Sequence, residues 1–339
     1  MTKQELRAFF KPHLRAEYPA SPASGTTSCG QSTDDSTLFV SLAGIRAWSE
    51  MHVLPERESM ARLLSHNIWA ERFRRNYGLF SPQDMARLLR SRVLVLGCGG
   101  LGGHVSELLA RMGAGFLRLV DNDVFEESNL NRQRFCTESA LGRPKAFVVR
   151  ESLADTASHL EAEALQVEAN EHNLPDLVRG MDVALDCLDN ITAKAALEKA
   201  SLAAGVPFVH GSILRDEGFA YVNAGPRPRL AELYPQGQSS EELARARREG
   251  VGTLAPAAVA CLMIRLCLRA LLFPPQPLNA NVRHAVSIEK SLTAGSFSAQ
   301  SEDASTGLSI AATGGPPAVL SPLYHLDMSV PELERFFWD

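Results

Sequence analysis

The stretch "RVLVLGCGGLGGHVSELLARMG", from Arg92 to Gly113, decides the fold. It opens with a short apolar run, which is typical of a buried parallel strand. A cluster of glycines follows, and glycine permits the tight turns that connect a strand to a helix. Apolar residues then recur at helical spacing, at Val105, Leu108 and Leu109, until Gly113 ends the segment. The stretch therefore predicts a strand, a glycine turn and a helix in succession.

Strand and helix patterns continue to alternate on the C-terminal side of this stretch. Strand-like runs are "FLRLVD", "EAEALQVEA", "DVALDCLD", "PFVHGSI" and "GFAYVNA", and helix-like runs are "KAFVVRESLADT", "LPDLVRG" and "TAKAALEKASLAAG". This alternation predicts an α/β fold, Rossmann-like and doubly wound. We expect a mostly parallel sheet with helices on both faces and a few extra antiparallel strands.

Composition shifts divide the chain into three expected parts. Residues 1–65 read as a partly irregular N-terminal extension, with some helix near "PERESMARLL". Residues 66–275 form the α/β domain. Residues 276–339 form a C-terminal segment with two strand candidates, "VRHAVSIE" and "LYHLDMSV", around a Ser/Ala/Gly-rich stretch at 292–319 that we interpret as a mobile loop.

The overall composition is that of a soluble globular protein, with 45% hydrophobic residues, 22% charged residues and a net charge of -5. This charge gives no indication of general nucleic-acid binding. The six cysteines are scattered, which suits a reducing cytoplasm. The opening "MTKQELRAFFKPHL" lacks the order of a signal peptide. The apolar stretch "LAPAAVACLMIRLCLRALLF" is interrupted by Arg265 and Arg269, which favours a buried or interface helix over a membrane span. We therefore expect a cytoplasmic protein.

The glycine turn has the spacing of a nucleotide site. Gly97, Gly99 and Gly102 fit G-x-G-x-x-G between strand and helix, and Gly100 adds further freedom. Glycines there let backbone N–H groups approach a phosphate at the positive end of the helix. Asp121 ends the next strand, where a carboxylate can accept a hydrogen bond from a ribose hydroxyl. A strand-helix turn without a ligand, or the site of a dinucleotide oxidoreductase, would have the same pattern.

Several motifs together carry a resemblance to a known family. They are "LVLGCGGLGGHVSELLARMGAGFLRLVDNDVFEESNLNRQRF", "GRPKA" and, further on, "LDCLDN". Over roughly residues 67–272 the chain resembles the ThiF/MoeB/HesA adenylyltransferases, bacterial relatives of ubiquitin-activating enzymes. The resemblance implies an enzyme that uses ATP and Mg²⁺ to adenylate a carboxylate, usually the C-terminal glycine of a small ubiquitin-like sulfur carrier protein, and releases pyrophosphate.

The resemblance places Asn129, Arg132, Gln133 and Lys145 in contact with ATP. A carboxylate that attacks the α-phosphate brings like charges together, so positive groups must stabilise the developing charge. The planar guanidinium of Arg132 suits phosphate oxygens, and Lys145 supplies a point charge. The two amides orient phosphate and ribose without adding charge. Taken singly, the arginine and the lysine would read as surface charges.

Two further residues follow from the resemblance. Asp189, in "DCLDN", corresponds to a carboxylate that helps to hold Mg²⁺. Asp186 is its competitor, and either aspartate could simply cap the following helix. Arg75, in "ERFRRNYG", corresponds to an arginine that reaches the triphosphate of the neighbouring subunit, which implies a homodimer. Arg72 and Arg74 are the alternatives at this position, as is a solvated basic face.

The sequence also departs from the family. Many members bind zinc through two C-x-x-C pairs, but no such pair occurs here, so zinc is not expected. The crossover segment 223–250, where some members carry a reactive cysteine, contains none, so no covalent relay is expected there. Cys187 and Cys136 read as packing residues near the site.

Three alternatives to carrier adenylation stay open at this stage. One is activation of another acyl or amide group, on a modified tRNA nucleoside or a peptide. The second is an NAD-dependent oxidoreductase, for which "NLNRQ" and "GRPK" would need another explanation. The third is a non-catalytic scaffold, which would have no need for all of Arg132, Lys145 and Asp189.

Overall fold

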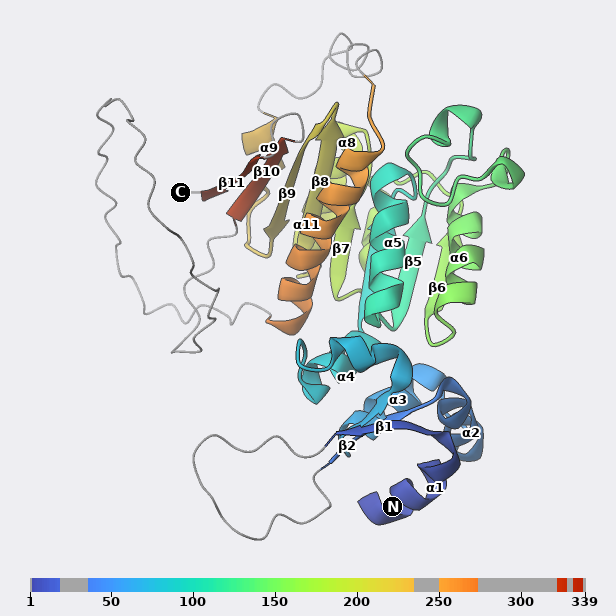
Figure 1. Ribbon diagram of the computed structural model, residues 1–339. Coiled ribbons are helices and arrows are strands. Elements are labelled where there is room, and N and C mark those ends of the chain that lie inside the picture. Colours follow the sequence, from blue (N-terminus) through green and yellow to red (C-terminus); the bar gives the residue numbers. More distant parts are fainter. Residues whose placement is uncertain (1, 19–35, 235–249, 274–321, 328–331, 338–339) are drawn as a thin grey trace, which may run out of the picture. The chain divides into compact units, whose positions relative to one another are not determined.

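The computed structural model describes residues 2–18, 36–234, 250–273, 322–327 and 332–337. Residues 1–274 and 321–339 belong to one compact unit. Its larger sheet has eight strands in the order β11-β10-β9-β8-β7-β4-β5-β6 (Figure 1). These strands are β4 (Arg92–Leu96), β5 (Phe116–Val120), β6 (Glu161–Leu165), β7 (Val183–Asp186), β8 (Phe208–Leu214), β9 (Glu217–Asn223), β10 (Pro322–Asp327) and β11 (Glu332–Phe337).

The predicted Rossmann-like sheet is confirmed. Strands β8, β7, β4, β5 and β6 run parallel, whereas β9, β10 and β11 extend the sheet with antiparallel pairs. The tail candidate "LYHLDMSV" overlaps β10, and β11 was not anticipated. The candidate "VRHAVSIE" and the stretch 292–319 lie outside the described residues.

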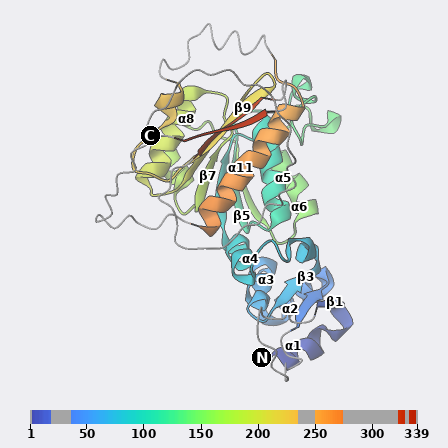
Figure 2. The ribbon, with the colours of Figure 1, turned by 60° about the vertical axis from the view of Figure 1, so that its left-hand side comes forward.

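Helices cover both faces of the sheet. Helices α5 (Gly100–Met112), α6 (Lys145–Thr156) and α11 (Leu254–Leu272) lie on one face, and α7 (Leu174–Val178), α8 (Ile191–Ala203) and α9 (Leu230–Leu233) lie on the other (Figures 1 and 2). The alternation along β4 explains this arrangement. Val93 and Val95 pack into one hydrophobic core, and Leu94 and Leu96 pack into the other. A central parallel strand is therefore apolar throughout, as its sequence indicated.

The order of the strands reverses at β4 and β7, and in doubly wound sheets the ligand crevice lies at the carboxyl ends of the strands where this reversal occurs. From β4 the chain moves through β5 to β6 on one side, and then returns to place β7 on the other side of β4. Ligands of doubly wound sheets bind at such a reversal of strand order. The glycine turn follows β4 and the "DCLDN" motif spans the end of β7, so the fold places both at this crevice.

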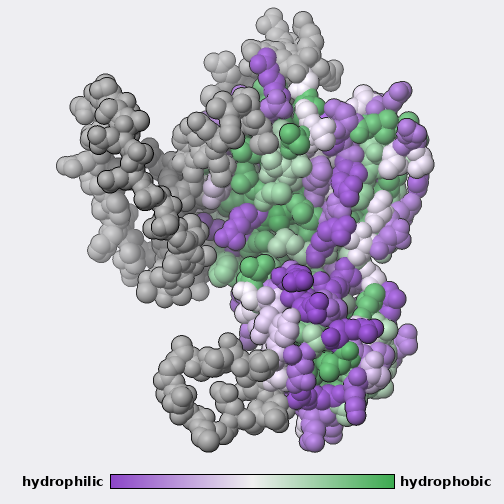
Figure 3. Space-filling view, in the orientation of Figure 1, coloured by the Kyte–Doolittle hydropathy of each residue, from purple (hydrophilic) through white to green (hydrophobic). Residues whose placement is uncertain are grey.

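Helix α11 is the one helix in the described part of the chain that is long and apolar enough to cross a membrane, judged by length and composition alone. It contacts α5 and strands β8 and β9, and Val259, Met263 and Cys267 are fully buried. Apolar surface is also visible along this helix (Figure 3), and Leu254 at its start is 67% exposed. This packing against the sheet and α5 explains the apolar composition of α11 as that of a core helix.

The N-terminal residues contain more regular structure than the sequence indicated. Their elements are α1 (Lys3–Phe10), the 3-10 helix η1 (Lys11–His13), β1 (Leu14–Tyr18), β2 (Thr37–Val40), α2 (Leu42–His52), α3 (Glu56–Leu64) and β3 (Ile68–Ala70). The strands form a separate sheet in the order β1-β2-β3. Phe39 of β2, Trp69 of β3 and Phe10 of α1 are buried. A second 3-10 helix, η3 (Glu71–Asn76), and α4 (Pro82–Arg90) lead into β4.

Candidate active site

Steric contacts in the glycine turn explain why its residues are glycines. Gly97 has φ +92°, and a Cβ there would lie 2.5 Å from the carbonyl oxygen of Cys187. A Cβ on Gly102 would lie 1.8 Å from the carbonyl oxygen of Gly97. The turn therefore folds tightly against the end of β7. Helix α5 begins at Gly100, so its unpaired N–H groups point into the crevice, where they can bind an anion.

Asp121 braces this turn from the neighbouring strand. Its carboxylate accepts hydrogen bonds from the backbone N–H of Cys98 at 2.6 Å and of Asp123 at 2.8 Å. Burial raises the pKa of Asp121, while these two N–H donors and the charge of Lys145 oppose the rise. A carboxylate has about four acceptor positions, so these bonds leave capacity for a ribose hydroxyl. Sequence reasoning predicted the ribose contact but missed the contact with the turn.

Gln133 faces the glycine turn. The residue is buried, and its side-chain Nε2 lies 3.5 Å from the position that a Cβ on Gly99 would occupy. Among the described residues, its Oε1 has no hydrogen-bond partner. A buried polar atom without a partner is costly, and a ligand in the crevice would satisfy it. Gln133 thus fits a nucleotide site.

Asn129 and Arg132 lie on the same loop. Asn129 is buried, and its Oδ1 accepts the backbone N–H of Glu126 at 3.1 Å, so it holds the loop in shape. Nη1 of Arg132 donates to the carbonyl oxygen of Ser128 at 2.7 Å and to Oδ1 of Asn131 at 2.9 Å. No ion pair of Arg132 occurs within the described part of the chain. Its guanidinium therefore retains donors for phosphate oxygens.

The beginning of α11 closes against this loop. Thr253 donates its hydroxyl to the carbonyl oxygen of Asn131 at 2.6 Å, and Asn131 donates its side-chain amide to the carbonyl oxygen of Val251 at 3.3 Å. A Cβ on Gly100 would lie 3.6 Å from Pro256, within ordinary contact distance. Asn131 therefore connects this loop to the residues that precede α11.

Lys145 opens α6 and forms an ion pair that the sequence reasoning did not identify. Its Nζ lies 2.9 Å from Oδ2 of Asp123. The lysine side chain is 9% exposed, whereas that of the aspartate is 60% exposed. The D-x-D spacing of Asp121 and Asp123 was the available signal. In this arrangement the ammonium group is held near the glycine turn, and the exposed carboxylate is its only ion-pair partner among the described residues.

The structure separates the two candidate metal ligands. Asp186 is fully buried and accepts hydrogen bonds from Lys194, from His210 and from the backbone N–H of Leu188. Asp189 is exposed. Its side chain forms no hydrogen bond or ion pair with another residue in the described part of the chain. It lies two residues beyond Cys187, whose carbonyl contacts the glycine turn. The assignment of the Mg²⁺ contact to Asp189 stays a prediction.

A single carboxylate is consistent with Mg²⁺. The described residues contain no group of three or more His, Cys, Asp or Glu side chains that could hold a metal ion without other ligands. Mg²⁺ usually takes one or two protein carboxylates together with substrate phosphates. Helix capping near Ile191 is carried out by Asn190, whose Oδ1 accepts the N–H groups of Thr192 and Ala193. Asp189 therefore stays available to a ligand.

Arg75 lies away from the other site residues. Arg72 donates to the carbonyl oxygen of Thr156, at the last residue of α6, and Arg74 pairs with Glu71. Asn76 donates to Met112, at the last residue of α5. Arg75 is exposed between them. Because α5 has 13 residues and begins at the glycine turn, its length of about 20 Å separates Arg75 from its own chain's turn.

A family comparison agrees with this geometry. The ThiF family model matches residues 73–305. The chain belongs to the ThiF family. It is 31% identical to the SAMP-activating enzyme E1 of Haloferax volcanii over 201 residues, which span 59% of this chain and 74% of that protein. It is 36% identical to the adenylyltransferase and sulfurtransferase MOCS3 of Sus scrofa over 181 residues, or 53% of this chain and 40% of that protein.

The ThiF-family fold also recurs in solved structures. The structure of Escherichia coli MccB with ATP matches with a TM-score of 0.57 at 17% identity, and covers 86% of this chain and 82% of that one. PaaA matches with a TM-score of 0.55 at 15% identity, over 79% of this chain and 82% of that one. These likenesses confirm the fold. The prediction of an adenylyltransferase agrees with the family and with the names of its sequence relatives.

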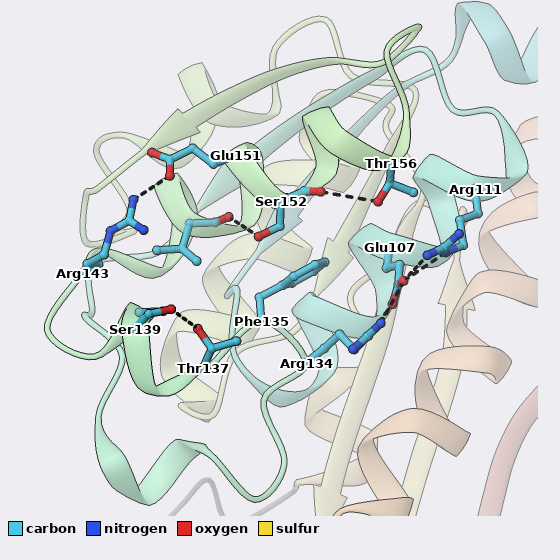
Figure 4. A pocket seen from close by; sticks show the side chains of 12 residues that line it. Glu107, Arg111, Arg134, Phe135, Thr137, Ser139, Arg143, Glu151, Ser152 and Thr156 are labelled. Atoms are coloured by element: carbon cyan, nitrogen blue, oxygen red, sulfur yellow. Dashed lines mark hydrogen bonds and ion pairs between the residues drawn. The ribbon is translucent and has the colours of Figure 1, made fainter. Parts of the chain in front are cut away.

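The described residues of this ThiF-family chain also form a cavity of about 350 Å³ between α5, α6 and residues 134–143 (Figure 4). Gln133 faces the glycine turn, whereas the next two residues, Arg134 and Phe135, line this cavity. Arg134 and Arg111 both pair with Glu107, and the hydrogen bond from Arg134 is the largest factor that lowers the pKa of Glu107 to about 2. The cavity's charged groups are thus paired with one another and do not belong to the nucleotide site.

The cysteines near the ThiF-family site are poor nucleophiles. Burial raises the pKa of Cys98, of Cys136 and of Cys187. The thiolate is the reactive form of cysteine, so a raised pKa disfavours reaction of these thiols at neutral pH. The exposed Cys261 lies on α11, outside the crevice.

Proposed function

We propose that this chain uses ATP and Mg²⁺ to adenylate the C-terminal carboxylate of a small ubiquitin-like sulfur carrier protein. The observation that carries the proposal is that the Gln133 side chain and the Arg132 backbone lie beside the glycine turn, while Lys145 lies close enough to Asp121, which braces this turn, for its charge to act on that carboxylate. The names of the relatives, a SAMP-activating enzyme and MOCS3, support a carrier protein as substrate. A carrier of thiamin- or molybdopterin-type sulfur transfer is the finer proposal, and the cytoplasm is the proposed location.

The chemistry follows from the charges at the crevice. A carboxylate oxygen of the substrate attacks the α-phosphorus of ATP, the bond from that phosphorus to the bridging oxygen breaks, and the electron pair leaves with pyrophosphate. Arg132 and Lys145 stabilise the negative charge that develops on the phosphate oxygens. Gln133 and Asp121 orient phosphate and ribose. When bound, Mg²⁺ neutralises phosphate charge, and Asp189 would hold it.

The acyl-adenylate is the expected product, without a covalent relay on the enzyme. Segment 223–250 contains no cysteine. Cys98 lies within the glycine turn and is buried, and Cys187 beside the turn is half-buried; burial raises the pKa of both thiols, which disfavours the reactive thiolate. The proposal therefore leaves transfer of the activated acyl group to a second protein or to a small nucleophile.

We further propose a homodimer in which each site is completed by its neighbour. Arg75 cannot reach the glycine turn of its own chain, because the length of α5 lies between them. Its exposure leaves it available to a second copy. Leu254 and Phe273, at the two ends of α11, are 67% and 70% exposed, and such side chains favour burial in an interface.

The test is ATP-pyrophosphate exchange in the presence of Mg²⁺. Candidate carrier proteins are added singly, and Arg132→Ala serves as the control variant. We expect exchange that depends on one carrier and disappears in the variant. If ATP binds but no carrier supports exchange, the substrate is another acyl or amide group, and peptides and modified tRNA are tested next. If hydride exchange with NAD occurs instead, or ATP does not bind, adenylation is refuted.

A further inference from the structure

Two charged residues on the inner face of α8 are buried one helical turn apart. Lys194 is 3% exposed and Glu198 is 0% exposed. Lysine and glutamate are almost never fully buried unless they are paired. Helix α8 begins directly after the turn that carries Asp189, so the partners of these two residues bear on the site.

Lys194 fixes the start of α8 to the end of β7. Its Nζ lies 3.2 Å and 3.1 Å from the two carboxylate oxygens of Asp186, and it donates to the carbonyl oxygen of Gly211 at 2.8 Å. Nδ1 of His210 lies 2.7 Å from the same carboxylate. Burial is the largest factor that lowers the pKa of His210, and the charge of Lys194 lowers it further.

This contact controls the turn 187–190. Asp186 is the last residue of β7, and its Oδ1 also accepts the backbone N–H of Leu188 at 3.1 Å. At the other end of the turn, the side chain of Asn190 caps α8. The turn is therefore held at its first residues by a buried carboxylate and at its last residue by the helix cap. Asp189 projects from a short segment with little freedom to move.

Glu198 fixes the opposite part of α8 to the segment that leads to α9. Its carboxylate accepts the backbone N–H of Arg229 at 3.0 Å and of Leu230 at 2.9 Å. It also accepts the hydroxyl of Tyr221 at 3.1 Å and the side-chain amide of Asn223 at 2.8 Å. These donors come from β9 and from the beginning of the segment that the sequence identified as the crossover.

We propose that Lys194 and Glu198 are positioning residues, and that they make α8 a rigid connection between the Asp189 turn and the crossover segment. The inference rests on the proposed function, since it takes Asp189 at one end of the connection to hold the metal ion of the bound nucleotide. Stability alone does not account for the charges. Replacing a buried ion pair with apolar residues is often neutral or stabilising. A fixed geometry does account for them. The carboxylate of Asp186 accepts hydrogen bonds from α8 and β8, and the carboxylate of Glu198 accepts hydrogen bonds from β9 and from residues 229–230.

The experiment measures ATP affinity by calorimetric titration, once with Mg²⁺ and once with EDTA. Wild type, Asp189→Ala and Lys194→Met are compared, with the exposed Lys199→Met on the same helix as the matched control. We expect wild type and Lys199→Met to gain affinity from Mg²⁺, and Asp189→Ala to lose this gain. In Lys194→Met the gain in ATP affinity from Mg²⁺ should be smaller by about tenfold or more, which is the usual effect of removing a residue that orients a metal ligand. Lys194→Arg keeps the cation and should retain most of the gain.

Two further measurements keep the test decisive. Lys194→Met leaves Asp186 buried without its cation, so thermal unfolding is followed alongside, and the double variant Asp186→Asn/Lys194→Met removes both charges and should fold. Glu198→Gln should speed amide hydrogen exchange in residues 229–233 and leave the affinity for ATP with Mg²⁺ unchanged. If wild type shows no Mg²⁺-dependent ATP binding, the proposed function fails. If it does, and folded Lys194→Met keeps the full gain, only the positioning role is refuted.

Discussion

Replacing Lys145 with methionine separates phosphate binding from folding. The side chain of Lys145 is 9% exposed and already desolvated, and its ion-pair partner Asp123 is 60% exposed. Methionine fills a similar volume, and the carboxylate of Asp123 stays hydrated after the change. We therefore expect the free energy of unfolding to change by less than about 1 kcal/mol, the range for exposed ion pairs.

The effect on ATP binding should be larger. A hydrogen bond to a charged group contributes about 1.5–3 kcal/mol. Loss of the contact from Lys145 to a phosphate should therefore weaken ATP binding by roughly 10- to 150-fold. Because Asp123 competes with phosphate for the same ammonium group, Asp123→Asn should strengthen binding, by at most about fivefold. Calorimetric titration with ATP and Mg²⁺ measures both changes, and thermal unfolding verifies the fold of each variant.

Two results would refute this reasoning. If Lys145→Met binds ATP within about twofold of wild type, the lysine only forms the ion pair with Asp123 and does not contact a phosphate. Weaker binding by Asp123→Asn would mean that Asp123 acts on the ligand itself, for instance through the metal ion. The exposed Lys199→Met is the control for the loss of one positive charge, and it should bind ATP as wild type does.

Gly102→Ala should abolish ATP binding and lower the melting temperature, because its Cβ would lie 1.8 Å from the carbonyl oxygen of Gly97. Arg75→Ala and Arg132→Ala should each be inactive in pyrophosphate exchange, whereas a refolded mixture of the two should recover part of the activity, since a mixed dimer contains one intact site. Burial lowers the pKa of His159 to about 3. The unfolded chain takes up that proton near pH 6.5, so wild type should lose up to about 2 kcal/mol more than His159→Leu between pH 7 and pH 5 in denaturant titrations.

Each of these expectations has its own control. Gly100→Ala should fold with near wild-type stability, because its Cβ would meet Pro256 only at 3.6 Å. Unmixed samples of each arginine variant set the background for the mixture, and activity no higher than that background would contradict a shared site. An equal pH response of His159→Leu and wild type would show that the buried ring, which lacks hydrogen-bond partners among the described residues, is protonated without unfolding.

The sequence predicted those features that depend on local pattern. The β4-turn-α5 unit could be recognised because apolar periodicity and steric demand for glycine are both properties of neighbouring residues. Lys145 and Asp189 could be selected because the family's motifs fix their positions. The small N-terminal sheet was missed because a Ser/Thr/Gly/Pro-rich stretch separates β1 from β2, and a strand of five exposed or half-buried residues has little periodicity.

The contacts that tune the site could not be predicted in the same way. The partner of Lys145 lies 22 positions away, and the partners of Glu198 lie 23 to 32 positions away. Burial of a charge depends on which elements surround it, and this is set only when the sheet and its helices are assembled. Lys194 and Glu198 looked in the sequence like the polar residues of any helix.

The strand pairing at the end of the chain makes the C-terminus part of the main sheet. The described residues stop at Phe273 and resume at Pro322, and β10 pairs with β9 from Tyr324 to Asp327. A proteolytic cut between these points would leave two fragments that remain associated through that pairing and through buried Leu323. The protein is thus suited to split-protein complementation, in which residues 322–339, supplied as a separate peptide, complete the edge of β9.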